Sequence, residues 1–309
     1  WDAGIATALT LVEGYLKRPL KVGRSDAKPK ILTIDGAGVR SIVALVFLER
    51  LETELLRVGK RLSASFDLIV GSSFGSYFAA RLAQGASVST ITDETYTMFP
   101  AAMKKRFLTL GTLYSMSELR EYLDGMFGNE GLAAAPNCAF STFEMTTGQH
   151  MLWSHHPSLS TPGVSPRLAD VVAASMAAPI YFKPINITRN DGVELSLIDG
   201  AIWAAEPTRL GLDASRKMFT PRPLVGDILL ISVGSGRDMT PIFKDSKQNV
   251  LSWATTLPTV LLRSNREAID EHVKGLYRDA GALQNYIRLD PELPTDQPWP
   301  MDSVNDVPR

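Results

Sequence analysis

The stretch that decides the fold runs from residue 31 to residue 75 and contains two strand-and-turn units. It begins with ILTIDGAG at residues 31–38, a short apolar run that leads directly into a glycine-rich turn. It ends with FDLIVGSSFG at residues 66–75, a second apolar run that also leads into a turn. Short apolar runs bounded by turn residues are typical of buried strands.

The segment between these two runs predicts a helix. From Ser41 to Arg57, apolar residues recur at helical spacing, with glutamates between them. The apolar stretch after Gly75 predicts a second helix. Strand, helix, strand and helix form a βαβ unit, in which the strands run parallel and need helical cover. We therefore expect an α/β fold with a mostly parallel sheet covered by helices.

The rest of the chain carries weaker signals, and we expect a single domain over residues 1–309. The later segments with a recognisable pattern are residues 90–135 (helical and irregular), 136–154 and 193–199 (strand-like), Leu168–Ala178 (a helix that Pro179 ends) and Ile228–Val233 (a strand). At the ends, residues 1–30 predict a helix over 3–16 and then a basic connector, and residues 290–309 predict an extended surface segment. The chain opens on Trp1 rather than Met, so we expect a truncated or excised piece.

Composition and charge exclude several classes of protein. Of the 309 residues, 45% are hydrophobic and 21% charged, as in a folded globular protein. The 32 basic and 33 acidic residues nearly cancel, which argues against a nucleic-acid partner. Cys138 is the only cysteine, so an intrachain disulfide and a metal site of several thiolates are excluded. No apolar run is long enough to cross a bilayer, so we expect a cytoplasmic protein or one peripheral to a membrane.

The first chemical signal is Gly71-Ser-Ser-Phe-Gly75, which matches the pattern Gly-x-Ser-x-Gly directly after a buried strand. A nucleophilic serine needs an exposed hydroxyl on a tight strand-to-helix turn, and flanking glycines leave room for a substrate. The helix after Ser73 would also direct free N–H groups and its positive dipole end toward an oxyanion. Ser73 is therefore a candidate nucleophile, and the alternative is a turn whose serine only caps the helix.

The second signal is Asp35-Gly-Ala-Gly-Val-Arg40, a loop between the first strand and its helix. The N–H groups of Gly36, Ala37 and Gly38 would form a concave nest for an anion, with positive charge from Arg40 nearby. A dinucleotide-binding loop is a competing interpretation, but it needs a third glycine where this chain has serine. A plain glycine-rich turn, with Arg40 in an ion pair, is the remaining alternative.

The third signal is Ile198-Asp-Gly-Ala201, in which a carboxylate ends a strand-like run. Asp199 could accept the proton of a serine hydroxyl. An ordinary aspartate has a pKa of about 3.9, so it becomes a useful base only where burial or hydrogen bonds tune it. Asp-Gly is also common in turns, so this motif is weak evidence when it stands alone.

Taken in order, the three motifs resemble those of the patatin-like phospholipases. Three further stretches are similar to motifs of that family: Ala174–Pro184 to Ser-Ala-Ala-Pro-x-x-Phe, Glu206-Pro-Thr208 to Asn-Pro-Thr, and Ile231–Gly236 to Ser-Leu-Gly-Thr-Gly. The likeness covers roughly residues 29–240. It implies a patatin-like three-layer fold, with helices on both faces of the sheet, and hydrolysis of acyl lipids.

The resemblance also implies a role for each matching residue. Ser73 would be the nucleophile and Asp199 the base of a Ser–Asp dyad, and the N–H groups of Gly36, Ala37 and Gly38 would form the oxyanion hole. The supporting residues would be Arg40, Gly71, Gly75 and Gly200. The substrate would be a phospholipid or another acyl lipid, reached by peripheral contact with a membrane, and neither a metal nor a cofactor is implied.

The chain departs from the family pattern at three places. Ala37 and Ser41 stand where the family has glycine, and Ala205-Glu206 stands where it often has Asn-Asn. Alanine disfavours positive φ, so Ala37 bears on the geometry of the loop, whereas Ser41 bears on how closely the helix packs. Because of these departures, a catalytically silent scaffold or lipid-binding protein with the same fold remains an alternative.

A Ser–His–Asp hydrolase is the other enzymatic alternative, because the chain order Ser73, Asp199, His272 is permitted for the α/β-hydrolase fold. The short stretch before Ser73 leaves room for a single helix, however, whereas that fold has several strands before its nucleophile. His272 also lies in a charged helical stretch, where a surface histidine is expected.

Three apolar residues after the nucleophile would line an acyl channel or pack in the core: Phe74, Tyr77 and Phe78.

Overall fold

The structure is a computed structural model, and it describes residues 28–102, 112–241 and 250–293. The helix predicted over residues 3–16, most of the connector and most of the C-terminal segment lie outside the described residues. In the described part, no helix combines the length and the apolar character needed to cross a bilayer.

A central sheet organises the molecule, with strand order β5-β6-β3-β2-β1-β7-β9, and β4 pairs with β3 as a branch. Its strands are β1 (Lys30–Ile34), β2 (Leu68–Gly71), β3 (Cys138–Glu144), β4 (Gln149–Ser154), β5 (Ile185–Thr188), β6 (Glu194–Asp199), β7 (Leu229–Val233) and β9 (Tyr286–Leu289). The five strands from β3 to β9 are mutually parallel, whereas β4 and β6 pair with β3 in the antiparallel sense. The predicted α/β class with a mostly parallel sheet is confirmed.

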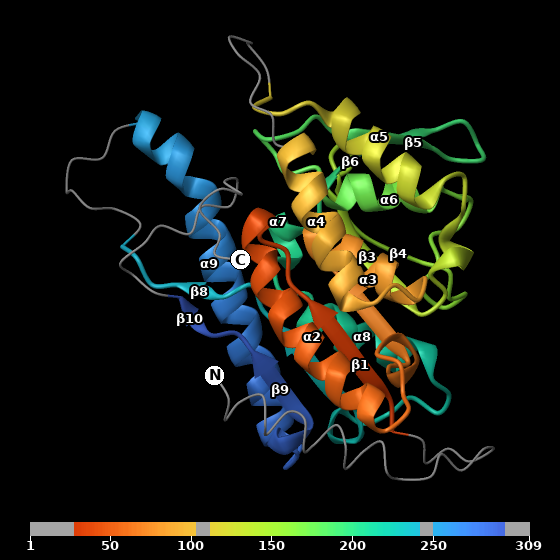
Figure 1. Ribbon diagram of the computed structural model, residues 1–309, viewed down its shortest axis with the longest axis vertical. Coiled ribbons are helices and arrows are strands. Elements are labelled where there is room, and N and C mark those ends of the chain that lie inside the picture. Colours follow the sequence, from red (N-terminus) through yellow and green to blue (C-terminus); the bar gives the residue numbers. More distant parts are fainter. Residues whose placement is uncertain (1–27, 103–111, 242–249, 294–309) are drawn as a thin grey trace.

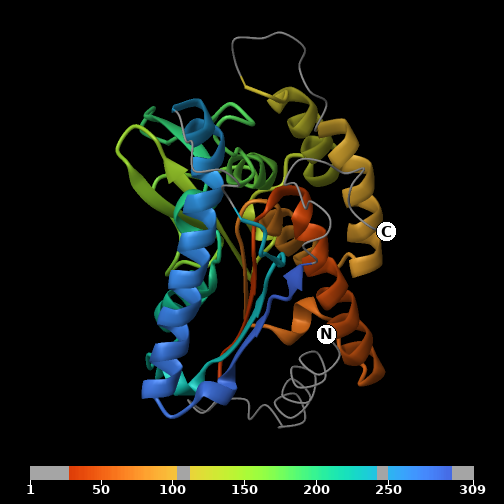
Figure 2. The same cartoon turned by 90° about the vertical axis from the view of Figure 1, so that its left-hand side faces the viewer.

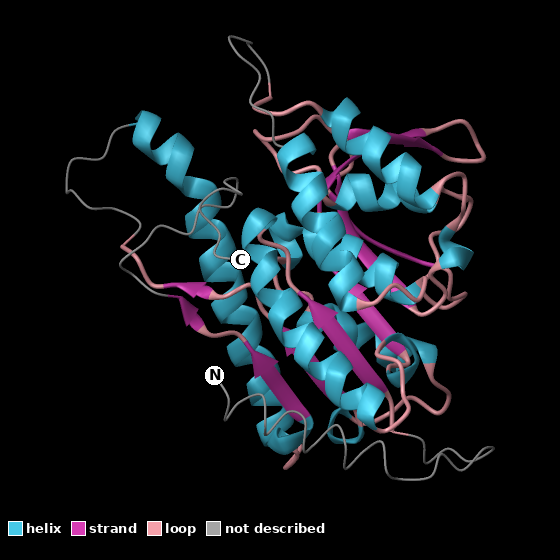
Figure 3. Ribbon diagram, in the orientation of Figure 1, coloured by secondary structure: helices cyan, strands magenta, loops and turns pink. Residues whose placement is uncertain are grey.

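Helices cover both faces of this sheet. They are α2 (Ile42–Arg57), α3 (Phe74–Ala83), α4 (Val88–Ala102), α5 (Met116–Phe127), α6 (Leu168–Ser175), α7 (Ala201–Ala204), α8 (Thr208–Met218) and α9 (Val250–Asp279), with short 3-10 turns η1 (Gly38–Ser41), η2 (Ser63–Ser65), η3 (Leu132–Ala134), η4 (Val225–Asp227) and η5 (Leu283–Asn285). Figure 2 shows the strands almost edge-on, with α9 on one side and α2 and α4 on the other. The same layering is visible by element type in Figure 3, and a two-stranded sheet of β8 (Arg237–Asp238) and β10 (Glu292–Leu293) lies beside it.

The alternation of side chains along the strands explains the two helical layers. In β1, Leu32 and Ile34 belong to the core shared with α2 and α3, whereas Ile31 faces the core shared with α8 and α9. In β2, Ile69 faces the first core and Val70 the second. Strands buried on both faces read as continuous apolar runs, which is why the sequence identified them.

Candidate active site

Ser73 occupies the sharp turn between β2 and α3 in a strained backbone conformation. Its φ is 51° and its ψ is −130°, and among the described non-glycine residues only Ile180 shares a positive φ. Such a conformation is costly for an L-residue and persists where the surrounding structure enforces it. The turn lifts the hydroxyl of Ser73 toward the end of β6, as a nucleophile turn requires.

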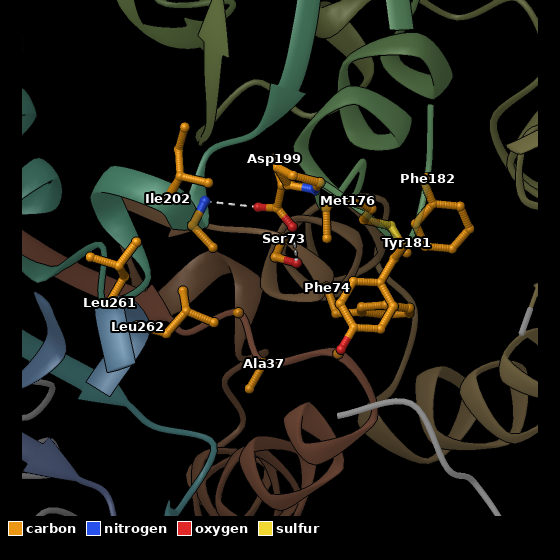
Figure 4. Close-up of a pocket in the computed structure, with 15 residues that line it drawn as sticks. Ala37, Ser73, Phe74, Met176, Tyr181, Phe182, Asp199, Ile202, Leu261 and Leu262 are labelled. Atoms are coloured by element: carbon orange, nitrogen blue, oxygen red, sulfur yellow. Dashed lines mark hydrogen bonds between the residues drawn. The ribbon is translucent and has the colours of Figure 1, made fainter. Parts of the chain in front are cut away.

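Asp199, the last residue of β6, lies directly opposite that hydroxyl. Ser73 Oγ donates a hydrogen bond of 2.7 Å to Asp199 Oδ2, and the Ala201 N–H donates one of 2.7 Å to Oδ1. Figure 4 shows both bonds converging on the carboxylate. Only 2% of Asp199 is exposed. Burial raises the pKa of its carboxyl to about 7, against the opposing effect of the two hydrogen bonds.

The glycines of the motifs are required by close packing of the backbone around Ser73. A Cβ added at Gly36 would lie less than 3.0 Å from the Ser73 side chain. The same holds for three other glycines against neighbouring atoms: Gly71 against the Gly75 backbone, Gly75 against the Ile34 carbonyl, and Gly200 against Ser141. These contacts are too close for any side chain, so the strand ends can approach each other only through glycine.

The loop from Gly36 to Gly38 borders Ser73, but its N–H groups are not equally available. The Gly36 N–H donates to the Ala205 carbonyl at 3.3 Å, and the Ala37 N–H donates to Ser41 Oγ at 3.0 Å. Within the described part of the chain, the Gly38 N–H has no acceptor. Ala37 has a φ of −161°, so this position does not need glycine, whereas Gly38 has a φ of 58°.

A cavity of about 250 Å³ opens in front of the Ser73–Asp199 pair. Figure 4 shows Ile202, Leu261 and Leu262 on one side of the pair and the aromatic residues on the other. The side chains that line the cavity are mostly apolar, and they include Phe74, Met176, Tyr181, Phe182, Ile202, Leu261 and Leu262. Of the three apolar residues that follow the nucleophile, only Phe74 lines this cavity, because Tyr77 and Phe78 are fully buried in the core.

A second cavity of about 240 Å³, the charged cavity, lies across the Gly36–Ala37 segment. Arg40 borders it, is 5% exposed and lies 3.6 Å from Asp238, so it forms an ion pair away from Ser73. Burial and the neighbouring Arg266 lower the pKa of Arg40 to about 10.

Asp35 borders the same loop and is held by two arginines that the motifs did not indicate. Arg288 in β9 donates from Nη1 to Oδ1 at 2.8 Å and from Nη2 to Oδ2 at 2.6 Å. Arg266 in α9 lies 3.2 Å from Oδ2 and also donates to the Gly36 carbonyl at 3.2 Å. Asp35 is fully buried, so this paired guanidinium arrangement is what keeps its charge tolerable.

The histidine alternative finds no counterpart in this geometry. His272 is exposed on α9, and the residues around the first cavity include no histidine in the described part of the chain. The hydroxyl of Ser73 is hydrogen-bonded to a carboxylate instead.

Comparison with known proteins identifies relatives of this chain. The family model described as "Patatin-like phospholipase" matches residues 32–211, which is more than half of the chain. Patatin-like protein 1 of Arabidopsis thaliana is 27% identical, over 84% of this chain and 73% of its own length. Patatin-2-Kuras 4 of Solanum tuberosum is 24% identical, over 90% of this chain and 82% of its own.

One solved structure is also similar, at a greater distance. VipD from Legionella pneumophila aligns over 88% of this chain and 63% of its own, with 12% identity and a TM-score of 0.40. The match to the family model runs from within β1 to within α8 and includes both Ser73 and Asp199. The chain therefore belongs to the patatin-like phospholipase family.

Proposed function

We propose that this chain hydrolyses fatty-acyl esters of lipids through a dyad of Ser73 and Asp199. Membership of the patatin-like phospholipase family supports a lipid acyl hydrolase in broad terms. The observation that carries the finer proposal is the 2.7 Å hydrogen bond from Ser73 Oγ to Asp199 Oδ2 beside an apolar cavity. A base with a pKa of about 7 is well matched to proton transfer near neutral pH.

The reaction proceeds in two acyl-transfer steps. Asp199 accepts the hydroxyl proton of Ser73 while Oγ attacks the ester carbonyl, and the tetrahedral intermediate collapses when the alcohol leaves with that proton. Asp199 then takes a proton from water, which attacks the acyl-enzyme. Collapse of the second intermediate returns a proton to Ser73 and releases the fatty acid. The chemistry needs no redox partner, since no atom changes oxidation state.

The oxyanion is assigned to the loop of Gly36, Ala37 and Gly38. The Gly38 N–H is the member of this loop that has no competing acceptor among the described residues. The Ala37 N–H can contribute if the developing negative charge draws it from Ser41 Oγ, since a charged acceptor binds an N–H more strongly than a neutral hydroxyl does. Gly36 donates to Ala205 and therefore acts mainly by shaping the loop.

The cavity supports an acyl chain as the group bound beside the dyad. Its lining is mostly apolar, and the chain of a fatty acid gains free energy for each methylene that leaves water. Phospholipase A, lysophospholipase and esterase reactions all present such a chain next to an ester carbonyl. The substrate class is therefore a phospholipid or another acyl lipid, met at a membrane surface.

Active-site labelling tests the nucleophile directly. An alkyl fluorophosphonate should label the purified protein once, at Ser73, and Ser73→Ala should abolish both labelling and hydrolysis of a short-chain ester. His272→Ala should label and turn over like the parent chain. Loss of turnover in His272→Ala would instead favour a histidine triad.

A catalytically silent lipid-binding protein is the second candidate function. It is favoured by one observation, the engagement of the Ala37 N–H by Ser41 Oγ in place of an oxyanion. Folded protein that binds fatty acid, but neither reacts with the fluorophosphonate nor hydrolyses esters, would support this candidate over the enzyme.

A further inference from the structure

Two exposed apolar side chains, Ile202 and Leu261, line the cavity that holds Ser73, and four others lie on α9 or beside the lining segment Pro179–Tyr181. We call this set the mouth face, and it consists of Leu113 (43% exposed), Ile180 (53%), Ile202 (41%), Trp253 (42%), Leu257 (44%) and Leu261 (56%). Trp253, Leu257 and Leu261 are spaced by four residues along α9 and so follow one side of that helix. Such a cluster marks an interaction surface more often than chance exposure does.

The mouth face is continuous with the interior of the cavity. Leu261 and Ile202 line the cavity and are also exposed. On the opposite side, Ile180 lies between Pro179 and Tyr181, which both line the cavity. The Leu113 N–H donates to the Ile180 carbonyl at 3.0 Å, which holds these two residues next to each other. An apolar path therefore leads from the surface to Ser73.

The residues of this face lie in short uncharged stretches. No Asp, Glu, Lys or Arg occurs in residues 112–117, 176–182, 201–205 or 250–262, and each stretch ends at a charged residue: Glu118, Lys183, Glu206 or Arg263. A protein partner is normally oriented by polar and charged contacts at the rim of an interface, whereas a lipid surface needs only apolar contact. Apolar side chains from such stretches can enter the headgroup region without the cost of burying an ion.

Ile180 also has a strained backbone conformation. It has a φ of 75°, and a β-branched residue at positive φ is a genuine outlier. Its side chain is nevertheless more than half exposed, so the strain is not offset by packing in the core. Strain of this kind is typical of segments held in place for binding.

The overall arrangement would let this face approach a flat surface. Figure 1 shows α5 and the N-terminal end of α9 projecting at the same end of the molecule, and Figure 2 shows the same from the side. Leu113 comes just before α5, and Trp253 and Leu257 lie in the first turns of α9.

We propose that the mouth face docks on the surface of a neutral phospholipid bilayer, with Leu113, Ile180 and Leu257 entering the headgroup region. The inference rests on the proposed function, because hydrolysis of a lipid requires an acyl chain to pass from the bilayer into the cavity. Docking by this face lets the chain move along apolar side chains without crossing water.

Flotation with phosphatidylcholine vesicles tests the docking without any turnover. The parent for this test is Ser73→Ala, which cannot consume the vesicles. The double variant Leu113→Glu/Leu257→Glu should partition to vesicles about tenfold less, because two apolar contacts are lost and two charges must be desolvated. Leu224→Glu is the matched control. Leu224 is 71% exposed, and it lies just before η4 and the N-terminal end of β7, at the end of the sheet opposite to Ser73. It should partition within about twofold of the parent.

Activity measurements in the Ser73-containing chain separate this inference from the proposed function. The double variant should hydrolyse a soluble short-chain ester at the parent rate but lose activity on vesicles, since neither Leu113 nor Leu257 lines the cavity. Absence of ester hydrolysis in the parent would refute the proposed function and leave the flotation result to decide docking. Equal flotation of the parent and the double variant would overturn the docking inference. A parent that is dimeric, fails to float, and becomes monomeric in Leu257→Glu would overturn it in favour of contact between two copies.

Discussion

Two buried carboxylates lie on opposite sides of the Gly36–Gly38 loop, and their surroundings differ sharply. Asp35 follows β1 and Asp199 ends β6, and both are almost completely shielded from solvent. Asp35 faces the guanidinium groups of Arg288 and Arg266. Asp199 receives only the hydroxyl of Ser73 and one backbone N–H, and no cation contacts it among the described residues.

The difference teaches how one fold makes two kinds of buried aspartate. Burial raises the pKa of Asp35 as well, but Arg288 and Arg266 oppose that rise, and these ion pairs suit Asp35 to hold β1, β9 and α9 together. Without a cation, burial raises the pKa of Asp199 to about 7, so that carboxylate can gain and lose a proton during a reaction. The cavities follow the same division, because charged residues line the side of Asp35 and apolar residues line the side of Asp199.

The largest expected effect is on activity, from Asp199→Asn. The amide keeps the size of the side chain and can still bond to Ser73 and Ala201, but it cannot accept a proton. We expect kcat to fall by about a thousandfold or more, with no fall in Tm. Steady-state hydrolysis of a soluble ester and thermal unfolding would measure the two quantities. If Asp199→Asn retained most of the activity, Asp199 would not act as the base, and the two buried carboxylates would not differ in function.

The reciprocal variant, Asp35→Asn, should act on stability. It removes the two charge-assisted hydrogen bonds from Arg288, which keeps Asp290 at 2.8 Å as a partner, and we expect a loss of about 2 kcal/mol in the free energy of unfolding. Asp213→Asn is the matched control, because Asp213 forms an exposed pair with Arg209 at 3.6 Å and should change stability by less than about 0.5 kcal/mol. Urea unfolding compares them. Equal losses in the two variants would show that the buried ion pairs of Asp35 contribute no more to stability than an exposed pair does.

The pH dependence of stability should also separate the parent chain from Asp199→Asn. Between pH 3.8 and about 7, the folded state keeps a proton on Asp199 that the unfolded state has released. Stability linked to this group is therefore fully present below pH 3.8 and is lost as the pH rises through about 7.

Asp199→Asn stays neutral, so its stability should fall less over the same range, by a difference on the order of 2 kcal/mol. Urea unfolding at pH 4.5 and 7.5 measures the difference. Glu206, whose burial also raises its pKa to about 7, is present in both proteins and cancels in the comparison. Parallel pH profiles would contradict a raised pKa at Asp199.

The smallest effect is expected in the loop that divides the two carboxylates. Ser41→Ala removes the acceptor of the Ala37 N–H, which would then be unpaired in the free enzyme but paired with the oxyanion. We expect kcat to rise severalfold while stability falls by about 1 kcal/mol, since only the ground state loses a hydrogen bond. Ser215→Ala is the control: Ser215 is a buried serine on α8 whose hydroxyl donates to the Leu212 carbonyl, so its loss should lower stability alone. A fall in kcat for Ser41→Ala would mean that Ser41 holds the loop in its active shape.

The sequence predicted those elements whose signals are local. Apolar runs identified β1, β2 and β7, and helical spacing identified α2. The helix predicted over Leu168–Ala178 is α6, which ends at Ser175, before Pro179 is reached. The strand-like stretch over residues 136–154 proved to be the hairpin of β3 and β4. β5 and β9 were not foreseen, because Asn186 and Arg288 interrupt the apolar pattern of these four-residue strands.

In the candidate site, too, the residues with a local sequence signal were predicted and those without one were not. Ser73 and Asp199 were inferred from the order of short motifs, and the hydrogen bond between them is what the structure adds. Arg288 was missed because it lies 253 residues from Asp35 and an arginine within a strand carries no local signal of its partner. Ser41 was expected to affect helix packing, but its hydroxyl bonds to the Ala37 N–H, a contact that depends on the turn of η1.

The crowding of glycines around Ser73 has a consequence for interpreting related sequences. Gly36, Gly71 and Gly75 are required because backbones meet there, whatever the serine does. A descendant that had lost Ser73 or Asp199 would still be under selection to keep these glycines, since any side chain would force the strand ends apart. The glycine pattern therefore reports the packing of the fold. Whether a related protein has kept catalysis has to be judged from the side chains at positions 73 and 199.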